Sequence, residues 1–111
     1  MFTIPNSMSD IVATLLNLTS VFDNPVEITK VFDGIRIAHT FRNKWGVSII
    51  CHSGSYGGPQ GFWEVGVTYD GELNYDNPIT GYDAVIGYRS ADEVLDIIND
   101  VRALPDGPEC G

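Results

Sequence analysis

The sequence predicts an α+β domain, in which an antiparallel sheet of five or six strands carries an N-terminal and a C-terminal helix on one face. Three observations lead to this prediction. Apolar residues recur at helical spacing near both ends of the chain, they alternate with polar residues over several segments in between, and Asp-Gly pairs or glycine-rich stretches separate those segments. In this chain of 111 residues we expect residues 1–105 to form one domain and residues 106–111 a C-terminal tail.

The first predicted element is a helix that follows Ser7 or Ser9, because either hydroxyl can cap a helix N-terminus. The pattern continues until Asn24-Pro25, with apolar residues on one face, namely Ile11, Val12, Leu15, Leu16 and Leu18. This face is more apolar than a surface helix needs, so we expect it to pack on the sheet. The alternative is a partner-binding face, including a homodimer formed through this helix.

A hairpin is predicted next. Asp33-Gly34 is a typical two-residue type I′ turn, since both central positions need a positive φ, and it would join strands near 26–32 and 35–42. In the second strand His39 falls in an apolar row with Ile35, Ile37 and Phe41. We therefore interpret His39 as a core or edge histidine rather than a catalytic one.

A turn at Asn43-Lys44 leads to a third strand that ends at Cys51 and His52. A thiol and a base act together only if their side chains meet, whereas neighbours in a strand point to opposite faces of the sheet. We therefore do not expect an enzyme of the Cys-His type. The chain has only two cysteines, which predicts no disulfide framework and is typical of an intracellular protein.

The stretch SGSYGGPQG at residues 53–61 is rich in glycine. A phosphate-binding loop would need a helix after its glycines and usually a lysine. Here an alternating segment follows, and no basic residue occurs between Lys44 and Arg89. We interpret the stretch, which we call the SYGG loop, as a connection between strands, with Tyr56 over the sheet edge. The alternative is a contact loop for a macromolecular partner.

Asp70-Gly71 predicts a second hairpin, leading to a short strand with Leu73 and Tyr75. Oxygen-bearing side chains occupy every second position here, at Asp70, Glu72, Asn74 and Asp76. The run superficially resembles a calcium loop, but its glycine is second rather than sixth and its twelfth residue is Gly81 rather than glutamate. We therefore predict no metal site, and no other residues suggest a cofactor.

The last two predicted elements are a short strand at AVIGY and a helix that opens with a capping box from Ser90 to Glu93. The helix ends before Pro105, and its apolar face contains Val94, Ile97, Ile98, Val101 and Leu104.

An acidic line lies opposite that apolar face. Asp92, Asp96 and Asp100 are spaced i, i+4, i+8, with Glu93 beside them, and successive members are about 6 Å apart along the axis. The helix N-terminus favours Asp92 and Glu93. Nothing local favours Asp96 and Asp100, because aspartate is a poor helix former and each like-charged pair costs about 0.2–0.5 kcal/mol. The line is either a solvated face or a surface for a basic partner, which Glu64, Asp70, Glu72, Asp76 and Asp83 would extend if the fold brings them alongside.

The charge distribution is uneven. The net charge is −9, and residues 62–111 hold eleven acids against two bases, whereas residues 1–61 are balanced. Such a surface repels nucleic acid phosphates and attracts basic partners. No apolar run is long enough to span a bilayer, and the N-terminus has no signal-peptide pattern.

The segments WGVSIICHSGSYGG, GFWEVGV, YDNPIT, AVIGY and SADEVLDII resemble, in order and spacing, a family of small phage and prophage proteins of uncharacterised function. The chain departs from that pattern by inserting Gly81-Tyr82 before Asp83, by placing Ala84 ahead of Val-Ile-Gly, and by carrying its own N-terminal helix and hairpin. The resemblance implies a phage accessory protein that acts in the host bacterial cytoplasm. The family brings no activity, so no residue role is carried over.

These observations lead to one hypothesis and one alternative. The hypothesis is a small acidic phage protein, not an enzyme, that binds and inhibits a basic host protein such as a nuclease, a CRISPR effector or another nucleic-acid-binding factor, with mimicry of nucleic acid as one route. Direct contact with nucleic acid or membrane is not expected. The alternative is a structural or morphogenetic phage protein that self-associates through its first helix and the SYGG loop. The expected partner-binding residues are Asp92, Glu93, Asp96, Asp100, Asp70, Glu72, Asp76 and Tyr56.

Overall fold

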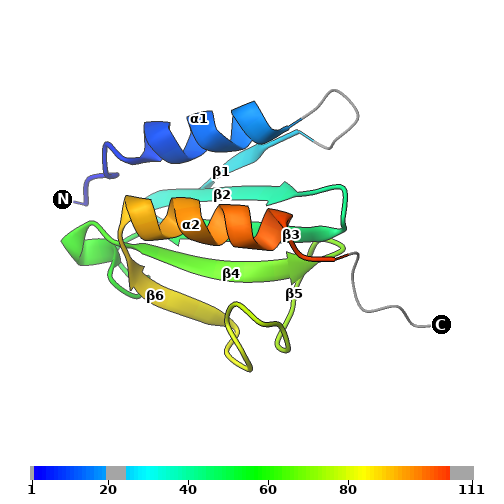
Figure 1. Ribbon diagram of the computed structural model, residues 1–111. Helices are drawn as coiled ribbons and strands as arrows, with labels where there is room; N and C mark the ends of the chain where they lie inside the picture. Colours follow the sequence, from blue (N-terminus) through cyan, green and yellow to red (C-terminus); the bar gives the residue numbers. More distant parts are fainter. Residues whose placement is uncertain (1, 20–24, 106–111) are drawn as a thin grey trace.

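The computed structural model describes residues 2–19 and 25–105. The elements follow one another as α1 (Met8–Leu18), β1 (Glu27–Val31), β2 (Gly34–Thr40), β3 (Trp45–Cys51), a 3-10 turn η1 (Gly58–Gln60), β4 (Trp63–Tyr69), β5 (Glu72–Leu73), β6 (Val85–Arg89) and α2 (Ala91–Arg102). Both helices lie over one face of an antiparallel sheet (Figure 1), which confirms the predicted fold class.

The sheet runs in the order β1-β2-β3-β4, and two short strands share the far edge of β4. β5 pairs with the end of β4 at Thr68 and Tyr69, whereas β6 pairs with its beginning, from Trp63 to Gly66. The pairings of β2, β3 and β4 place residues in straight rows across the sheet, for example Ile37, Ile49 and Val65. Alternate residues therefore face the helices, and the others face away from them.

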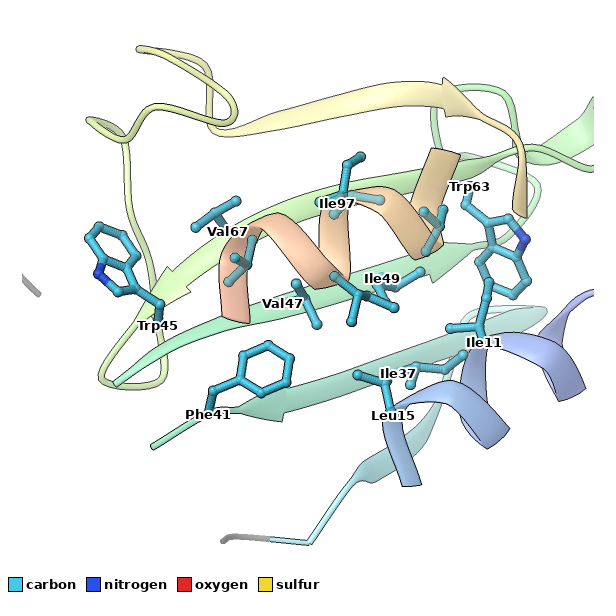
Figure 2. Packing of buried hydrophobic residues seen from close by; sticks show 14 of the residues in the cluster. Ile11, Leu15, Ile37, Phe41, Trp45, Val47, Ile49, Trp63, Val67 and Ile97 are labelled. Carbon is cyan, nitrogen blue, oxygen red and sulfur yellow. The ribbon is translucent and has the colours of Figure 1, made fainter. Parts of the chain in front are cut away.

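The core lies between the sheet and the two helices, which also contact each other. Figure 2 shows Ile11 and Leu15 of α1 next to Ile37 of β2. Each fully buried aliphatic side chain contributes about 1.5–3 kcal/mol. The fully buried residues include Ile11, Leu15, Ile37, Ile49, Trp63, Val65, Val67, Val94, Ile98 and Val101. None of the described helices combines the length and the apolar character that crossing a bilayer requires.

α1 differs in two ways from the prediction. Ser7 occupies the N-cap position, but its side chain makes no cap hydrogen bond; instead its Oγ accepts a hydrogen bond from Trp63 Nε1 at 3.0 Å. The helix ends at Leu18, and Thr19 is extended. The predicted stop at Asn24-Pro25 falls partly among residues 20–24, which lie outside the described residues.

The first hairpin turns one residue earlier than predicted. Val31 pairs with Gly34, so the turn residues are Phe32 and Asp33, and Gly34 opens β2. Phe32 has a positive φ (52°) and Gly34 does not, so the predicted type I′ turn at Asp33-Gly34 is wrong. Gly34 serves a different purpose: a Cβ there would lie 1.9 Å from the Cys51 carbonyl oxygen. Close approach of β2 and β3 requires the glycine.

The second hairpin is as predicted, because Asp70 (φ 54°) and Gly71 (φ 90°) both have positive φ between the paired residues Tyr69 and Glu72. The following strand is shorter than expected and does not reach Tyr75. An Asx turn, in which the Asp76 amide donates to Asn74 Oδ1 at 2.8 Å, bends the chain away from the sheet.

α2 is held at both ends. The predicted capping box is present, with Ser90 Oγ accepting from the Glu93 amide. At the other end a side chain from the β2–β3 turn caps the helix: Asn43 Nδ2 donates to the carbonyl oxygens of Val101, Arg102 and Leu104 at 3.1, 3.2 and 2.9 Å. Carbonyl groups that the helix itself leaves unpaired are thereby satisfied.

Candidate partner-binding surface

A groove of about 340 Å³ runs along α2 on the side of β6. Its rim on α2 carries three acids of the predicted surface, Glu93, Asp96 and Asp100, and we call it the acidic groove. The other lining residues are Pro78, Ile79, Ile86, Arg89 and Ile97. The structure therefore places part of the predicted acidic line against apolar side chains that come from a different segment of the chain.

The floor of the acidic groove is apolar. Ile97 is only 8% exposed, and Ile79 and Ile86 are half-buried and pack against the core cluster. These side chains are fixed by the core on their inner side and exposed to the groove on their outer side. A ligand would find a rigid apolar floor under a charged rim.

Glu93 is already engaged. Its carboxylate accepts a hydrogen bond from the Ser90 amide at 2.9 Å and forms an ion pair with Arg89 at 3.3 Å. The Ser90 backbone amide, followed by the Ser90 hydroxyl and Arg89, lowers the pKa of Glu93. Its charge therefore stabilises the start of α2 and balances Arg89.

Asp96 and Asp100 differ from Glu93 in this respect. Both side chains are exposed, and neither has a hydrogen bond or an ion pair with another described residue. Asp92 is also exposed, but it lies in the first turn, where the helix dipole favours it. The uncompensated charge of the acidic groove therefore comes from Asp96 and Asp100.

The other acids of the predicted surface do not line the acidic groove, namely Glu64, Asp70, Glu72, Asp76 and Asp83. Asp70 lines a hollow on the sheet face that carries no helix. Glu72 and Asp76 are exposed on β5 and in the connection to β6. Glu64 is buried, at 8% exposure, and accepts a hydrogen bond from the Tyr56 amide at 2.9 Å. The idea that Glu64 extends an acidic surface is wrong, because its side chain is buried and its carboxylate binds the backbone of the SYGG loop.

The SYGG loop joins β3 to β4 through η1, as predicted. Tyr56 is 64% exposed, and its carbonyl oxygen accepts from the Tyr88 amide at 3.1 Å, so it lies against the β6 edge. Phe62 and Tyr88 are also exposed, and a Cβ on Gly57 would meet both of them. Three exposed aromatic residues, Tyr56, Phe62 and Tyr88, therefore lie around Gly57 and β6. Arg89 of β6 lines the acidic groove.

Sequence analysis did not identify Phe62 and Tyr88 as exposed aromatic residues near Tyr56. The sequence feature that could have indicated an irregular strand here is the glycine inside AVIGY, since a glycine within a strand often marks a bulge. The pairing of β4 with β6 is indeed irregular between Trp63 and Val65, and Tyr88 has a positive φ (57°). Gly87 is required there, because its Cβ would lie 2.3 Å from Tyr56 Cβ.

Cys51 and His52 each hydrogen-bond to a glycine of the SYGG loop. Cys51 is buried in the core, and burial, with a smaller effect of the Asp33 charge, raises the pKa of its thiol to about 11. The thiol is therefore protonated at neutral pH and donates to the Gly58 carbonyl oxygen at 3.8 Å. His52 Nδ1 accepts from the Gly54 amide at 3.0 Å.

His39 is a core histidine, as the apolar row predicts, with its Nε2 3.3 Å from Thr19 Oγ1 and its ring edge-on to Phe41. Within residues 2–19 and 25–105, no three His, Cys, Asp or Glu side chains are placed to hold a metal ion together. Comparisons with protein-family models, with curated proteins and with solved structures gave no match.

Proposed function

We propose that the chain is a binding protein that inhibits a basic host protein by docking on a cationic segment through the acidic groove. The observation that carries this proposal is the combination of two uncompensated carboxylates, Asp96 and Asp100, with a rigid apolar floor. Either feature alone is ordinary for a small acidic protein. Together they match lysine and arginine side chains, which have apolar stems and charged ends.

The spacing of the carboxylates narrows the kind of segment. Asp96 and Asp100 are one helical turn apart, which is about 6 Å along the axis. A partner helix with basic residues at i and i+4 has the same spacing. Such helices are common on nucleic-acid-binding proteins, where they contact phosphates. A nuclease, a CRISPR effector or a similar factor of the host bacterial cytoplasm would lose that contact when the acidic groove covers its helix.

The net charge of the chain adds to the attraction that Asp96 and Asp100 exert on a basic segment. The charge of −9 draws a basic partner toward the chain over a distance set by ionic strength. Because Asp96 and Asp100 are exposed, we expect them to affect the association rate and the salt dependence most strongly.

The proposal is tested by capture from host lysate, followed by titration of the captured protein. The variant Asp96→Lys with Asp100→Lys reverses the groove charge, and Glu72→Lys with Asp76→Lys is the matched control, because it makes the same change in net charge at exposed positions outside the groove. We expect a basic protein to bind the wild type and the control in a salt-sensitive manner and to be lost by the groove variant.

Two results would contradict the proposal. Equal loss of binding in both double variants would show that overall charge alone matters and that the acidic groove has no special role. Self-association on a sizing column, with no captured protein and no effect of either variant, would favour a structural phage protein. For such self-association α1 offers less surface than expected, because Ile11 and Leu15 are buried in the core and Leu16 (57% exposed) remains outside.

A further inference from the structure

The sheet face opposite the helices contains a hollow of about 480 Å³. We call it the open-face hollow. Two neighbouring rows across β2, β3 and β4 contain no residue larger than threonine: Ala38, Ser48 and Gly66 form one row, and Thr40, Gly46 and Thr68 form the other. The exposed face of an antiparallel sheet usually carries long polar side chains. Because long side chains are absent from these two rows, space remains above this part of the sheet.

These small residues are also well protected, although no helix covers them. Ala38 is 8% exposed and Thr68 only 4%. A Cβ on Gly66 would lie 2.5 Å from Leu73 Cδ2, and a Cβ on Gly46 would lie 2.6 Å from Thr68 Oγ1. Gly46 and Gly66 therefore let Thr68 and Leu73 pack closely against the sheet.

The guanidinium group of Arg36 is held at this hollow. The Nε of Arg36, which lines it, donates to Ser48 Oγ at 3.1 Å, and this contact fixes the guanidinium on the sheet face. No carboxylate of the described residues lies within ion-pair distance of Arg36. Two carboxylates, Glu27 on β1 and Asp70 in the β4–β5 turn, line other parts of the same hollow.

We infer that the open-face hollow binds a small cationic amino acid, with the chemistry of free lysine or arginine. The guanidinium of Arg36 presents donors to a planar carboxylate, which it can bind in a bidentate manner. The ammonium and side-chain cation of the ligand would pair with Glu27 and Asp70. Thr40 and Thr68 also line the hollow.

Charge and size select this class of ligand. The walls carry one cation and two carboxylates, which is the inverse of a molecule with one carboxylate and two cationic groups. A phosphate dianion would meet two like charges and only one arginine. The volume of about 480 Å³ lies within the range of small-molecule sites, roughly 300–1,000 Å³.

The test uses the full chain and calorimetric titration with L-lysine and L-arginine, with acetate and 1,4-diaminobutane as the two half-ligands. We expect saturable binding of the amino acids with Kd between about 10 μM and 1 mM, and weaker binding of both half-ligands. Arg36→Gln should weaken binding about tenfold or more, and Ala38→Leu should abolish it by filling the hollow. Amide NMR signals of Ala38, Thr40 and Thr68 should shift on titration.

The matched control is Asp10→Asn, which removes one exposed charge on α1, on the side of the sheet that carries the helices, and should leave amino acid binding unchanged. Three outcomes would overturn the inference: no saturable binding at ~10 mM ligand, equal affinity of wild type and Arg36→Gln, or equal affinity for 1,4-diaminobutane and L-lysine. Because the acidic groove and the open-face hollow lie on opposite sides of the sheet, each proposal can fail without the other.

Discussion

Replacement of Asn43 should destabilise the whole domain, although Asn43 lies in a turn. Its amide group donates to three carbonyl oxygens at the end of α2, and its Oδ1 accepts from the Trp45 amide at 3.0 Å. A net hydrogen bond contributes about 0.5–1.5 kcal/mol. Since two amide hydrogens serve three acceptors, we count the contacts to α2 as two bonds. Together with the bond from Trp45 this makes three bonds, so Asn43→Ala should lower the free energy of unfolding by about 1.5–4.5 kcal/mol.

Asn43→Asp should be about as harmful as Asn43→Ala, for a different reason. The carboxylate can still accept from the Trp45 amide, but it cannot donate to α2, and its charge faces carbonyl oxygens at the negative end of the helix. That end of the dipole disfavours an anion by about 0.3–1 kcal/mol, in addition to the two lost bonds.

The assay is equilibrium unfolding in urea at pH 7, followed by tryptophan fluorescence. Trp45 is a suitable reporter, because its Nε1 donates to the Pro105 carbonyl oxygen at 3.1 Å, beside the capped helix end. Asn99→Ala is the matched control: Asn99 makes one exposed bond, to the Leu95 carbonyl oxygen within α2, so its removal should change stability by no more than about 0.5 kcal/mol. If Asn43→Ala behaves like this control, the cap has no stabilising role and the reasoning is wrong.

Three further predictions concern the β1–β2 hairpin and the core. Gly34→Ala should lower the free energy of unfolding by more than about 2 kcal/mol, because its Cβ would lie 1.9 Å from the Cys51 carbonyl oxygen; unchanged urea unfolding would contradict this. The Ser53 amide, which donates to Asp33 Oδ1 at 2.9 Å, lowers the pKa of Asp33. Wild type should therefore be more stable than Asp33→Asn at pH 7, and thermal unfolding should show the difference disappearing as the pH falls through the lowered pKa; a constant difference at all pH values would argue against the contact. The pKa of the buried Cys51 thiol is raised to about 11. In a Cys110→Ser variant this thiol should therefore resist alkylation at pH 8 until urea unfolds the chain. Rapid labelling of the native protein would show instead that the thiol is accessible.

The elements that sequence analysis predicted well depend on local chemistry. The capping box at Ser90 and Glu93 and the positive φ values at Asp70 and Gly71 involve residues close in sequence, and all are present. The same reasoning failed at Gly34, where the glycine is needed for contact with Cys51, seventeen residues away. An Asp-Gly pair does not reveal whether its glycine serves the turn or a neighbouring strand.

The candidate site likewise has one part that could be predicted from local spacing and another that depends on strand pairing. The exposed line of Asp92, Asp96 and Asp100 follows from helical spacing, and the structure shows it. The floor of the acidic groove could not be predicted, because Ile79 and Ile86 reach α2 only through the pairing of β6 with β4. The open-face hollow likewise depends on the register that aligns Ala38, Ser48 and Gly66.

The way in which β5 and β6 divide the far edge of β4 has a consequence for aggregation. An unbroken outer strand offers a template to another chain, and fibrils can grow from it. Here that border is a two-residue strand followed, after a gap, by a bulged one, so an incoming chain would find no continuous ladder. β1 forms the other edge of the sheet, and the charged side chains of Glu27 and Lys30 on it would disfavour pairing with a second chain.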